Sequence, residues 1–268
     1  MLIADSRQDV VTSHGTLAVE QRAEGETAVL LLHGNSSGRG VFRHQFEGSF
    51  AARYRMIAFD LPGHGQSSDA LDPQRTYTLP GFADATLELL AALGISDAIV
   101  FGWSLGGHIA IEMISRYPGL RALRLSGSPP TGKLRGVNDM RKGFNTSPRA
   151  SIAGEPVWSE SDAHSFLHSL FGESADSFLL EAAMRADGRL RKRLLESSRE
   201  GVGTNQREAV ESATIPIAVV NGAEDPFVDL DYFETVNFQN LWDGVDHRLA
   251  GLGHAPFWAR CRCFQPVV

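Results

Sequence analysis

Short apolar runs, each followed by turn residues and then by a helical pattern, constrain the fold of this chain most. Four such runs lie at 28–32, 55–59, 98–101 and 215–220. Continuous Val, Ile and Leu runs are typical of strands buried on both faces, as in a parallel sheet covered by helices. Helical spacing of apolar residues follows at 82–93 and 105–117, which stop at Gly94 and Pro118. The alternation predicts an α/β fold with a doubly wound, mostly parallel sheet.

The middle of the chain differs from its two ends. Residues 131–211 contain no strong buried-strand run, hold many of the basic residues, and show amphipathic helical stretches at 161–170 and 176–184. We therefore expect a helical cap inserted at 131–211, with 1–130 and 212–268 forming the core. Such an insertion also accounts for a length of 268 residues, which exceeds one ordinary domain.

Composition excludes several classes of function. A formal net charge of −7 disfavours binding to nucleic acid or to an anionic membrane, since phosphate binding needs clustered Lys and Arg. Cys261 and Cys263 are too few for a disulfide framework. Residues 1–11 lack the basic start and apolar run of a signal peptide, and no apolar stretch reaches the roughly 18 residues of a membrane helix. We expect a cytoplasmic protein, a monomer by default, that acts on a small molecule.

The motif with the clearest chemical meaning is Gly-Trp-Ser-Leu-Gly at 102–106. It follows a buried strand and opens a helix, which is the context that a nucleophile elbow requires. Small residues on either side let the neighbouring backbone approach closely, so that the hydroxyl of Ser104 projects from the edge of the sheet. The amide of Leu105 lies at the helix start and can donate to an oxyanion.

A serine hydroxyl is a poor nucleophile at neutral pH, so this interpretation requires a base and a group that orients the base. Asp225 and His254 complete the chain order serine, acid, histidine that this architecture uses. His254 would take the proton of Ser104, and Asp225 would hold the imidazole in the correct tautomer. Glu224 remains a second candidate for the acid, although the place of Asp225 before Pro226 favours Asp225.

The loop at 33–38, after the first buried strand, is the expected source of a second oxyanion donor. Gly34 permits a tight turn there, and the backbone N–H of Asn35 could complete an oxyanion hole with Leu105. A role as an ordinary turn residue explains Asn35 as well, and the two roles are compatible. The candidate substrate contacts are Gly34, Trp103, Phe166 and Phe257.

Four motifs together resemble the α/β-hydrolase fold family over nearly the whole chain: those at 33–35, 60–67, 102–107 and 253–257. Within that superfamily, the stretches 33–37, 101–109 and 217–228 are similar to the AidH-type N-acyl-homoserine lactonases. The resemblance implies metal-independent, cofactor-free hydrolysis of the lactone of bacterial quorum-sensing signals, with Ser104, His254 and Asp225 as the catalytic residues. A broad short-chain carboxylesterase and a slow-turnover lactone receptor are the alternatives.

The sequence departs from these lactonases at three places. Asp225 stands where they carry Glu, and either carboxylate can accept the histidine N–H. Phe166 stands where they carry a cap Tyr, so one hydrogen bond of about 0.5–1.5 kcal/mol is lost, which would change the preferred substrate more than the reaction. Residues 258–268 lack the pattern of the final amphipathic helix that such proteins pack on the sheet.

Other conspicuous residues have simpler interpretations. His164 and His168 share a helical face, but the partner Glu of a zinc-binding helix is absent, and Cys261 and Cys263 have no nearby His. We therefore expect no metal. The apolar side chains between 158 and 171 could line an acyl-chain pocket, and helix packing explains them equally well.

Overall fold

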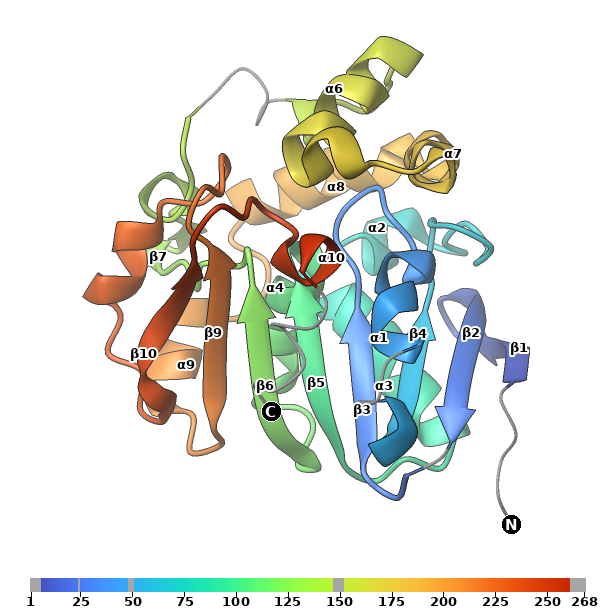
Figure 1. Cartoon of the computed structure of the whole chain (residues 1–268), viewed down its shortest axis with the longest axis horizontal. Helices are drawn as coiled ribbons and strands as arrows, with labels where there is room; N and C mark the ends of the chain where they lie inside the picture. The colour runs from blue at the N-terminus through green and yellow to red at the C-terminus, as the bar shows by residue number, and fades with distance from the viewer. Residues whose placement is uncertain (1–5, 24, 48–50, 147–151, 261–268) are drawn as a thin grey trace.

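An eight-stranded sheet forms the centre of the computed structural model, which describes residues 6–23, 25–47, 51–146 and 152–260 (Figure 1). The strand order is β1-β2-β4-β3-β5-β6-β9-β10. The bounds are β1 Ser6–Thr12, β2 Gly15–Ala23, β3 Ala28–Leu32, β4 Arg55–Phe59, β5 Ala98–Trp103, β6 Leu120–Ser126, β9 Ile217–Gly222 and β10 Leu241–Leu249. The pairs β1–β2 and β2–β4 are antiparallel and all others are parallel. The predicted α/β fold with a mostly parallel sheet is confirmed.

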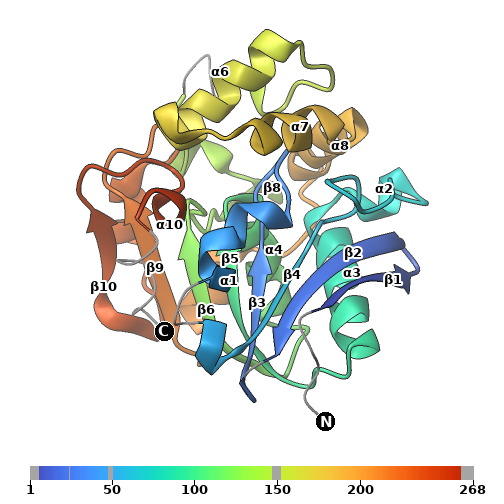
Figure 2. The same cartoon turned by 45° about the vertical axis from the view of Figure 1, so that its right-hand side comes forward.

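Helices cover both faces of this sheet. One face carries α1 (Arg43–Glu47), and the other carries α3 (Leu79–Ala92), α4 (Leu105–Met113) and α9 (Gln206–Ser212) (Figures 1 and 2). The strands β3 and β9 are buried at every residue, as expected for strands covered on both sides. The short helices α2 (Pro73–Thr76) and α10 (Pro256–Ala259) lie toward the carboxyl edge of the sheet, where loops from distant parts of the chain meet.

The sequence predicted the central elements better than the outer ones. The apolar runs at 28–32 and 55–59 match β3 and β4, whereas the runs at 98–101 and 215–220 become strands that end at Trp103 and Gly222. The expected helix at 105–117 ends at Met113 and continues as a turn. Strands β1, β2, β6 and β10 were not predicted. The edge strands β1 and β10 face solvent and lack a continuous apolar run, and charged residues interrupt the apolar residues of β2 and β6. Of the final segment predicted at 258–268, residues 258–260 are described and α10 ends at Ala259, whereas Cys261, Cys263 and the rest of the segment lie outside the described residues.

Three helices lie above the carboxyl edge of the sheet: α6 (Glu160–Phe171), α7 (Ser177–Arg185) and α8 (Gly188–Arg199) (Figure 2). All three fall within the segment that we expect to form a cap, and so does the small hairpin of β7 (Lys133–Leu134) and β8 (Val137–Asn138). The amide of Asp187 donates to the carbonyl of Gly63 (2.9 Å), and the Asp187 carboxylate accepts from the Tyr77 hydroxyl (2.6 Å). These contacts hold the start of α8 against the loops of the sheet.

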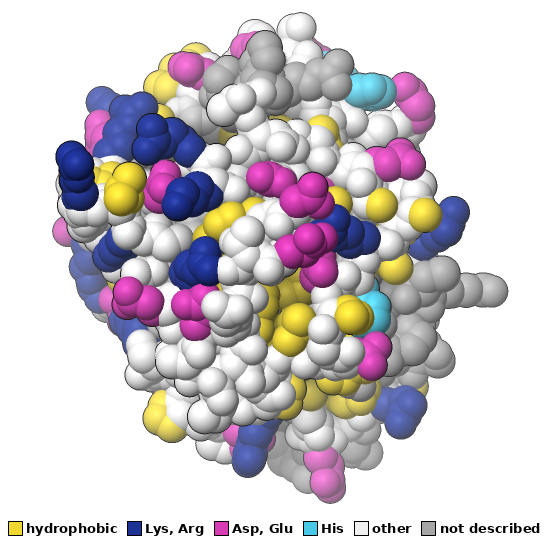
Figure 3. Space-filling model, turned by 90° about the vertical axis from the view of Figure 1, so that its left-hand side faces the viewer, with side chains coloured by type: hydrophobic (Ala, Val, Ile, Leu, Met, Phe, Trp, Pro, Cys, Tyr) yellow, Lys and Arg dark blue, Asp and Glu magenta, His cyan; other side chains and the backbone are white. Residues whose placement is uncertain are grey.

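The described helices include none whose length and hydrophobicity would suit a membrane crossing. The face in Figure 3 carries charges of both signs: Lys and Arg gather toward its left edge, and Asp and Glu cross its centre above a hydrophobic hollow. This mixture differs from the uniformly basic surface that phosphate backbones require.

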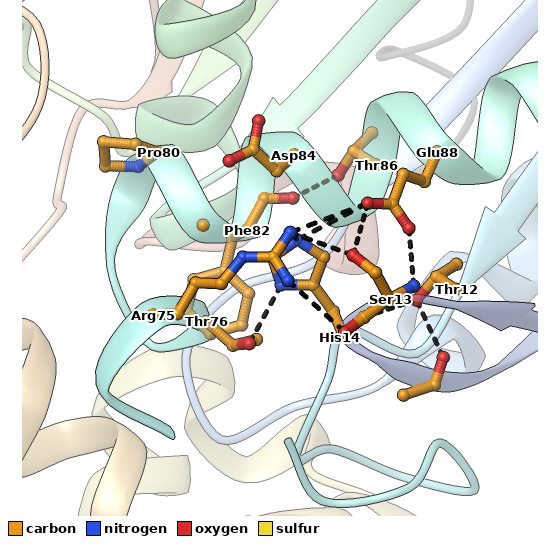
Figure 4. A network of polar contacts seen from close by, with 12 residues as sticks. Thr12, Ser13, His14, Arg75, Thr76, Pro80, Phe82, Asp84, Thr86 and Glu88 are labelled. Carbon is orange, nitrogen blue, oxygen red and sulfur yellow. Dashed lines mark hydrogen bonds and ion pairs between the residues drawn. The ribbon is translucent and has the colours of Figure 1, made fainter. Parts of the chain in front are cut away.

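A polar network fastens the turn between β1 and β2 to the helices beside it (Figure 4). The Glu88 carboxylate accepts from the amide and the hydroxyl of Ser13, each at 2.6 Å. His14 is fully buried, and its ring nitrogens contact the Thr76 hydroxyl (2.9 Å) and the Arg75 guanidinium (3.0 Å). Burial raises the pKa of Glu88, but the two bonds from Ser13 outweigh it and leave the pKa below its ordinary value.

We expect Glu88→Gln to lower the free energy of unfolding by about 1 kcal/mol at neutral pH, because a partly exposed carboxylate loses two charge-assisted bonds. A carboxyl with a lowered folded-state pKa stabilises above its unfolded pKa and stops doing so as pH falls through the folded value. The difference between the two proteins should therefore shrink below about pH 4. Urea denaturation at several pH values measures it.

The matched control is Glu26→Gln, at an exposed glutamate. It should leave the stability within about 0.5 kcal/mol at every pH. Equal stabilities of wild type and Glu88→Gln at pH 7 would show that the Ser13 bonds contribute nothing.

Candidate active site

Ser104 sits at the turn between β5 and α4 with a strained backbone. Its φ and ψ are 53° and −119°, outside the regions that residues with a side chain ordinarily occupy. Glycines make the turn sterically feasible: a Cβ at Gly102 would lie 2.5 Å from the Gly106 carbonyl oxygen, and one at Gly106 would lie 2.1 Å from that of Leu32. The predicted strand–serine–helix elbow is therefore present.

Two side chains from loops after β9 and β10 meet beside this turn. His254 Nδ1 lies 2.7 Å from Asp225 Oδ2, and both residues are buried. The other oxygen, Asp225 Oδ1, accepts from the amides of Phe227 (2.8 Å) and Val228 (3.2 Å). Because a carboxylate only accepts, it holds the Nδ1 proton in place and leaves Nε2 as the basic nitrogen. Glu224, the other candidate for the acid, is exposed.

The position of His254 is further restricted by its surroundings. Its carbonyl accepts from the indole N–H of Trp103 at 2.9 Å. Gly127, with φ of +64°, passes so close that a Cβ there would lie 2.6 Å from His254 Cε1. The amide of Gly127 donates to Asn221 Oδ1 at 2.8 Å, which fixes this backbone beside the ring. The ring therefore has little freedom to rotate away from the elbow.

The loop after β3 approaches Ser104 from the other side. Gly34 allows this approach, since a Cβ there would lie 3.2 Å from that of Ser104 and 3.0 Å from the Trp103 ring. The backbone N–H groups of Asn35 and Leu105 have no acceptor among the described residues. The Asn35 side chain is occupied, because its amide donates to Ala153 O (3.0 Å) and its oxygen accepts from Ser36 Oγ (3.1 Å).

Two buried histidines hold this loop against the loop after β4. His33 Nε2 accepts from the amide of Leu61 (3.0 Å), and His64 Nε2 accepts from the amide of Ser36 (3.2 Å). Burial lowers the pKa of both rings, so they are neutral at physiological pH. Ser36 has a φ of 52° and no exposed surface. The loop is thus held in a strained conformation by contacts from its neighbours.

A cavity of about 600 Å³ lies between the elbow and the cap, within the size range of small-molecule sites. Ser104 and His254 both line it, as do Asn35 and Leu105. Most of the remaining wall is apolar and includes Leu79, Met140, Phe144, Phe166, Leu170, Leu194, Leu195, Val202 and Phe227. The polar atoms are few, which is the usual composition of a site for a mostly apolar ligand.

The candidate substrate contacts divide into two groups. Phe166 lines the cavity and packs against the rings of Trp158 (4.8 Å) and Phe227 (6.0 Å between centroids). Trp103 and Phe257 have no exposed surface and pack edge to face behind the wall, with 5.3 Å between their ring centroids. Neither they nor Gly34 belongs to the cavity lining among the described residues. Gly34, Trp103 and Phe257 therefore support the cavity wall from behind.

Several polar residues of the cavity wall carry no clear signal in the sequence, among them His108, Gln206 and Arg191. His108 and Gln206 pair with each other (2.7 Å) on α4 and α9. Arg191, from α8, donates to Ser36 Oγ (3.0 Å) and to the carbonyls of Glu155 (2.6 Å) and Pro156 (3.0 Å). Burial lowers the pKa of Arg191 to about 10, so it stays charged at neutral pH. The only sequence signal was the place of His108, one helical turn after Ser104.

The histidines considered as metal ligands lie away from this cavity. His164 and His168 are exposed on α6, where they lie 3.8 Å from Glu160 and 3.6 Å from Glu173. Within the described ranges, no cluster of three or more His, Cys, Asp or Glu side chains has the arrangement of a metal site.

The geometry of the elbow and the loops around it agrees with a family comparison. The model of the alpha/beta hydrolase family matches residues 29–263. The chain belongs to the alpha/beta hydrolase family. The chain is therefore a hydrolase, and its homologues include a lactonase and an esterase.

Solved structures and curated proteins of the family resemble the chain to different degrees. The N-acyl homoserine lactonase AidH complexed with N-butanoyl homoserine is 45% identical, with 97% of this chain and 93% of that one covered and a TM-score of 0.91. A pimeloyl-[acyl-carrier protein] methyl ester esterase of Aromatoleum aromaticum is 29% identical over 85% of this chain and 91% of its own. A 2-hydroxy-6-oxononadienedioate/2-hydroxy-6-oxononatrienedioate hydrolase of a Pseudomonas species is 23% identical over 95% and 91%.

The strained elbow has a consequence for stability that is independent of activity. We expect the free energy of unfolding of Ser104→Gly to be about 1 kcal/mol higher than that of Ser104→Ala. Glycine relieves a backbone strain of about 1–3 kcal/mol and loses only part of that gain to chain entropy. Both variants lack the hydroxyl, so the comparison isolates the backbone. Urea denaturation measures the difference. An alanine variant as stable as the glycine variant would show that the conformation carries no strain.

Proposed function

We propose that this alpha/beta hydrolase opens the lactone ring of N-acyl-homoserine lactones, a quorum-quenching reaction, without a metal cofactor. The observation that carries the proposal is the meeting of Ser104 and His254 on one mostly apolar cavity wall, with Asp225 bonded to His254 at 2.7 Å. The 45% identity to AidH over 97% of the chain supports the choice of substrate. A neutral acyl lactone also suits a cavity with few polar atoms.

In the proposed reaction, Ser104 Oγ attacks the lactone carbonyl while His254 Nε2 takes the serine proton. The negative charge on the carbonyl oxygen is stabilised by the free N–H groups of Asn35 and Leu105. The ring C–O bond then breaks, and His254 returns the proton to the leaving ring oxygen. Asp225 stabilises the imidazolium that exists between these two proton transfers.

The second half of the reaction releases the product. Water attacks the acyl-enzyme as His254 takes its proton, and His254 returns that proton to Ser104 Oγ as the ester bond breaks. The released N-acyl-homoserine acid ionises to the carboxylate in water. The leaving alcohol remains tethered to the acyl group, so ring closure competes with water; tethered groups reach effective molarities of about 10⁵ M. Direct attack of water on the lactone, with His254 as base, avoids this competition and is the alternative route.

The cavity wall supports an acyl chain as the second part of the substrate. Phe166 and Phe227 belong to the wall, and Met140 and Leu195 extend it toward the surface, where both are partly exposed. Each buried methylene of an acyl chain contributes about 0.8 kcal/mol. Phe166 offers no hydroxyl to the substrate, which favours recognition through apolar contact.

The decisive experiment compares wild type and Ser104→Ala on a panel of N-acyl-homoserine lactones and aryl esters in the presence of a chelator, with products identified by mass spectrometry. We expect the wild type to prefer the lactones in kcat/KM and to keep its activity with chelator. Ser104→Ala should lose at least about 10³-fold.

Each other outcome contradicts a stated part of the proposal. A preference for simple esters would make the protein a short-chain carboxylesterase. Tight lactone binding with turnover slower than about one event per minute would make it a receptor rather than a typical enzyme. Near wild-type turnover by Ser104→Ala would replace the covalent route by direct attack of water.

The role of the acid has its own test. We expect Asp225→Asn to lower kcat about 10⁴-fold, because an amide in place of the carboxylate favours the wrong tautomer of His254. Glu224→Gln is the matched control, since Glu224 is exposed on the adjacent position, and it should stay within about twofold of wild type. The assignment of Asp225 would be wrong if the two effects were reversed.

A further inference from the structure

His108 lies in the cavity wall one turn of α4 beyond Ser104. It is 8% exposed, and its ring packs against that of Phe144 at 5.7 Å between centroids. Four residues of helix rise about 6 Å along the axis. The imidazole therefore borders the same cavity as the proposed nucleophile.

The pairing with Gln206 decides which nitrogen of His108 carries the proton. Gln206 Nε2 donates to the backbone carbonyl of His108 (3.1 Å), so Gln206 Oε1 is the atom that faces His108 Nδ1 at 2.7 Å. An amide oxygen only accepts, and Nδ1 must therefore donate. Burial lowers the pKa of His108, so the ring is neutral and Nε2 keeps a lone pair. Among the described residues, nothing donates to that Nε2.

Several other polar groups of the wall offer less to a donor. Arg191 only donates, and the oxygen of Asn35 already accepts from Ser36 Oγ. Glu155 is exposed and therefore hydrated. The Thr204 hydroxyl donates to Glu112 (2.9 Å). His108 Nε2 is thus an acceptor at the cavity wall, and the bond from Nδ1 to Gln206 keeps Nε2 unprotonated.

An N-acyl-homoserine lactone has a single N–H, and it is attached to the carbon next to the lactone carbonyl. With that carbonyl at Ser104 Oγ, the N–H lies a few ångströms away. We propose that His108 Nε2 accepts the hydrogen bond of this amide and so selects esters that carry an N–H beside the scissile carbonyl. The identity of the substrate rests on the proposed function, whereas the acceptor and its tautomer rest on the His108–Gln206 geometry.

A matched pair of substrates isolates this contact. The first is N-hexanoyl-homoserine lactone, and the second is its carba analogue, in which a CH₂ group replaces the N–H. The analogue leaves Nε2 without its donor, so we expect the wild type to prefer the amide by about 10- to 100-fold in kcat/KM. The ratio between the two substrates cancels any general loss of activity in a variant.

Two substitutions separate recognition from a structural role. In His108→Asn, the side-chain amide can occupy the place of Nδ1 and keep the bond to Gln206, but nothing replaces Nε2. In His108→Gln, the amide oxygen reaches the place of Nε2. We expect the preference to fall to about one in His108→Asn and to remain mostly intact in His108→Gln. Thermal denaturation checks that both variants are folded.

The reverse pattern overturns the inference. If His108 serves only to hold Gln206, His108→Asn should keep the wild-type preference, and His108→Gln should lose activity on both substrates equally. A wild type that hydrolyses the amide and its carba analogue at equal rates would overturn the inference directly.

An open-chain pair distinguishes this failure from failure of the proposed function. N-Hexanoylglycine methyl ester and its carba analogue differ by the same N–H but contain no lactone. If lactones are inert while these esters react, the lactonase proposal fails, and the amide preference on the open-chain pair still tests His108. If both lactones and esters react without any preference, His108 fails and the lactonase proposal stands.

Discussion

The close approach of three backbone segments around one strained serine is the constraint on which the rest of the site depends. Ser104 adopts φ of 53°, and the strain persists only because β5 and α4 are held by the sheet and its covering helices. Gly102, Gly106 and Gly34 remove the side chains that would separate these segments. The position of the Ser104 hydroxyl is therefore determined by the steric fit of the backbone.

Helix α8 is bonded to the loop after β3, which lies beside Ser104. Arg191 of α8 donates to Ser36 Oγ, which donates to Asn35 Oδ1, so a cap residue reaches the loop that carries the free Asn35 amide. The guanidinium lies 4.2 Å from the centroid of Trp158, and among the described residues it has no carboxylate partner. A buried cation held by carbonyls, a hydroxyl and a ring is stable only in one assembled geometry. The position of α8 and the conformation of the loop at 33–38 are therefore coupled.

Local sequence signals predicted the centre of the fold and of the site. The runs that became β3 and β4 are buried on both faces, so their continuous apolar residues predict strands inside the sheet. The edge strands β1 and β10 are exposed or half-buried along most of their length and gave no such signal. The elbow was recognisable because its glycines and its strand–helix context are all local in the chain.

Contacts between distant segments were beyond the reach of these signals. Glu224 and Asp225 are adjacent carboxylates, and only the fold directs one toward His254 and the other to solvent. Trp103 is next to Ser104 in sequence, yet alternation along β5 turns its ring away from the cavity into the core. His108 and Gln206 are 98 positions apart in the chain, and no pattern within either helix predicts that they pair.

In four of the buried histidines, the acceptor that faces Nδ1 determines the protonation of Nε2. Nδ1 of His33, His64 and His108 faces a carbonyl oxygen of Gly34, of Pro62 or of the Gln206 amide. None of these acceptors carries a full charge, and burial lowers the pKa of all three rings, so each works as a neutral acceptor at Nε2. His254 alone among these rings faces a carboxylate, whose charge compensates an imidazolium. The same side chain thus accepts from backbone amides at two positions, keeps an unprotonated Nε2 beside the cavity at a third, and is paired with a carboxylate at the fourth.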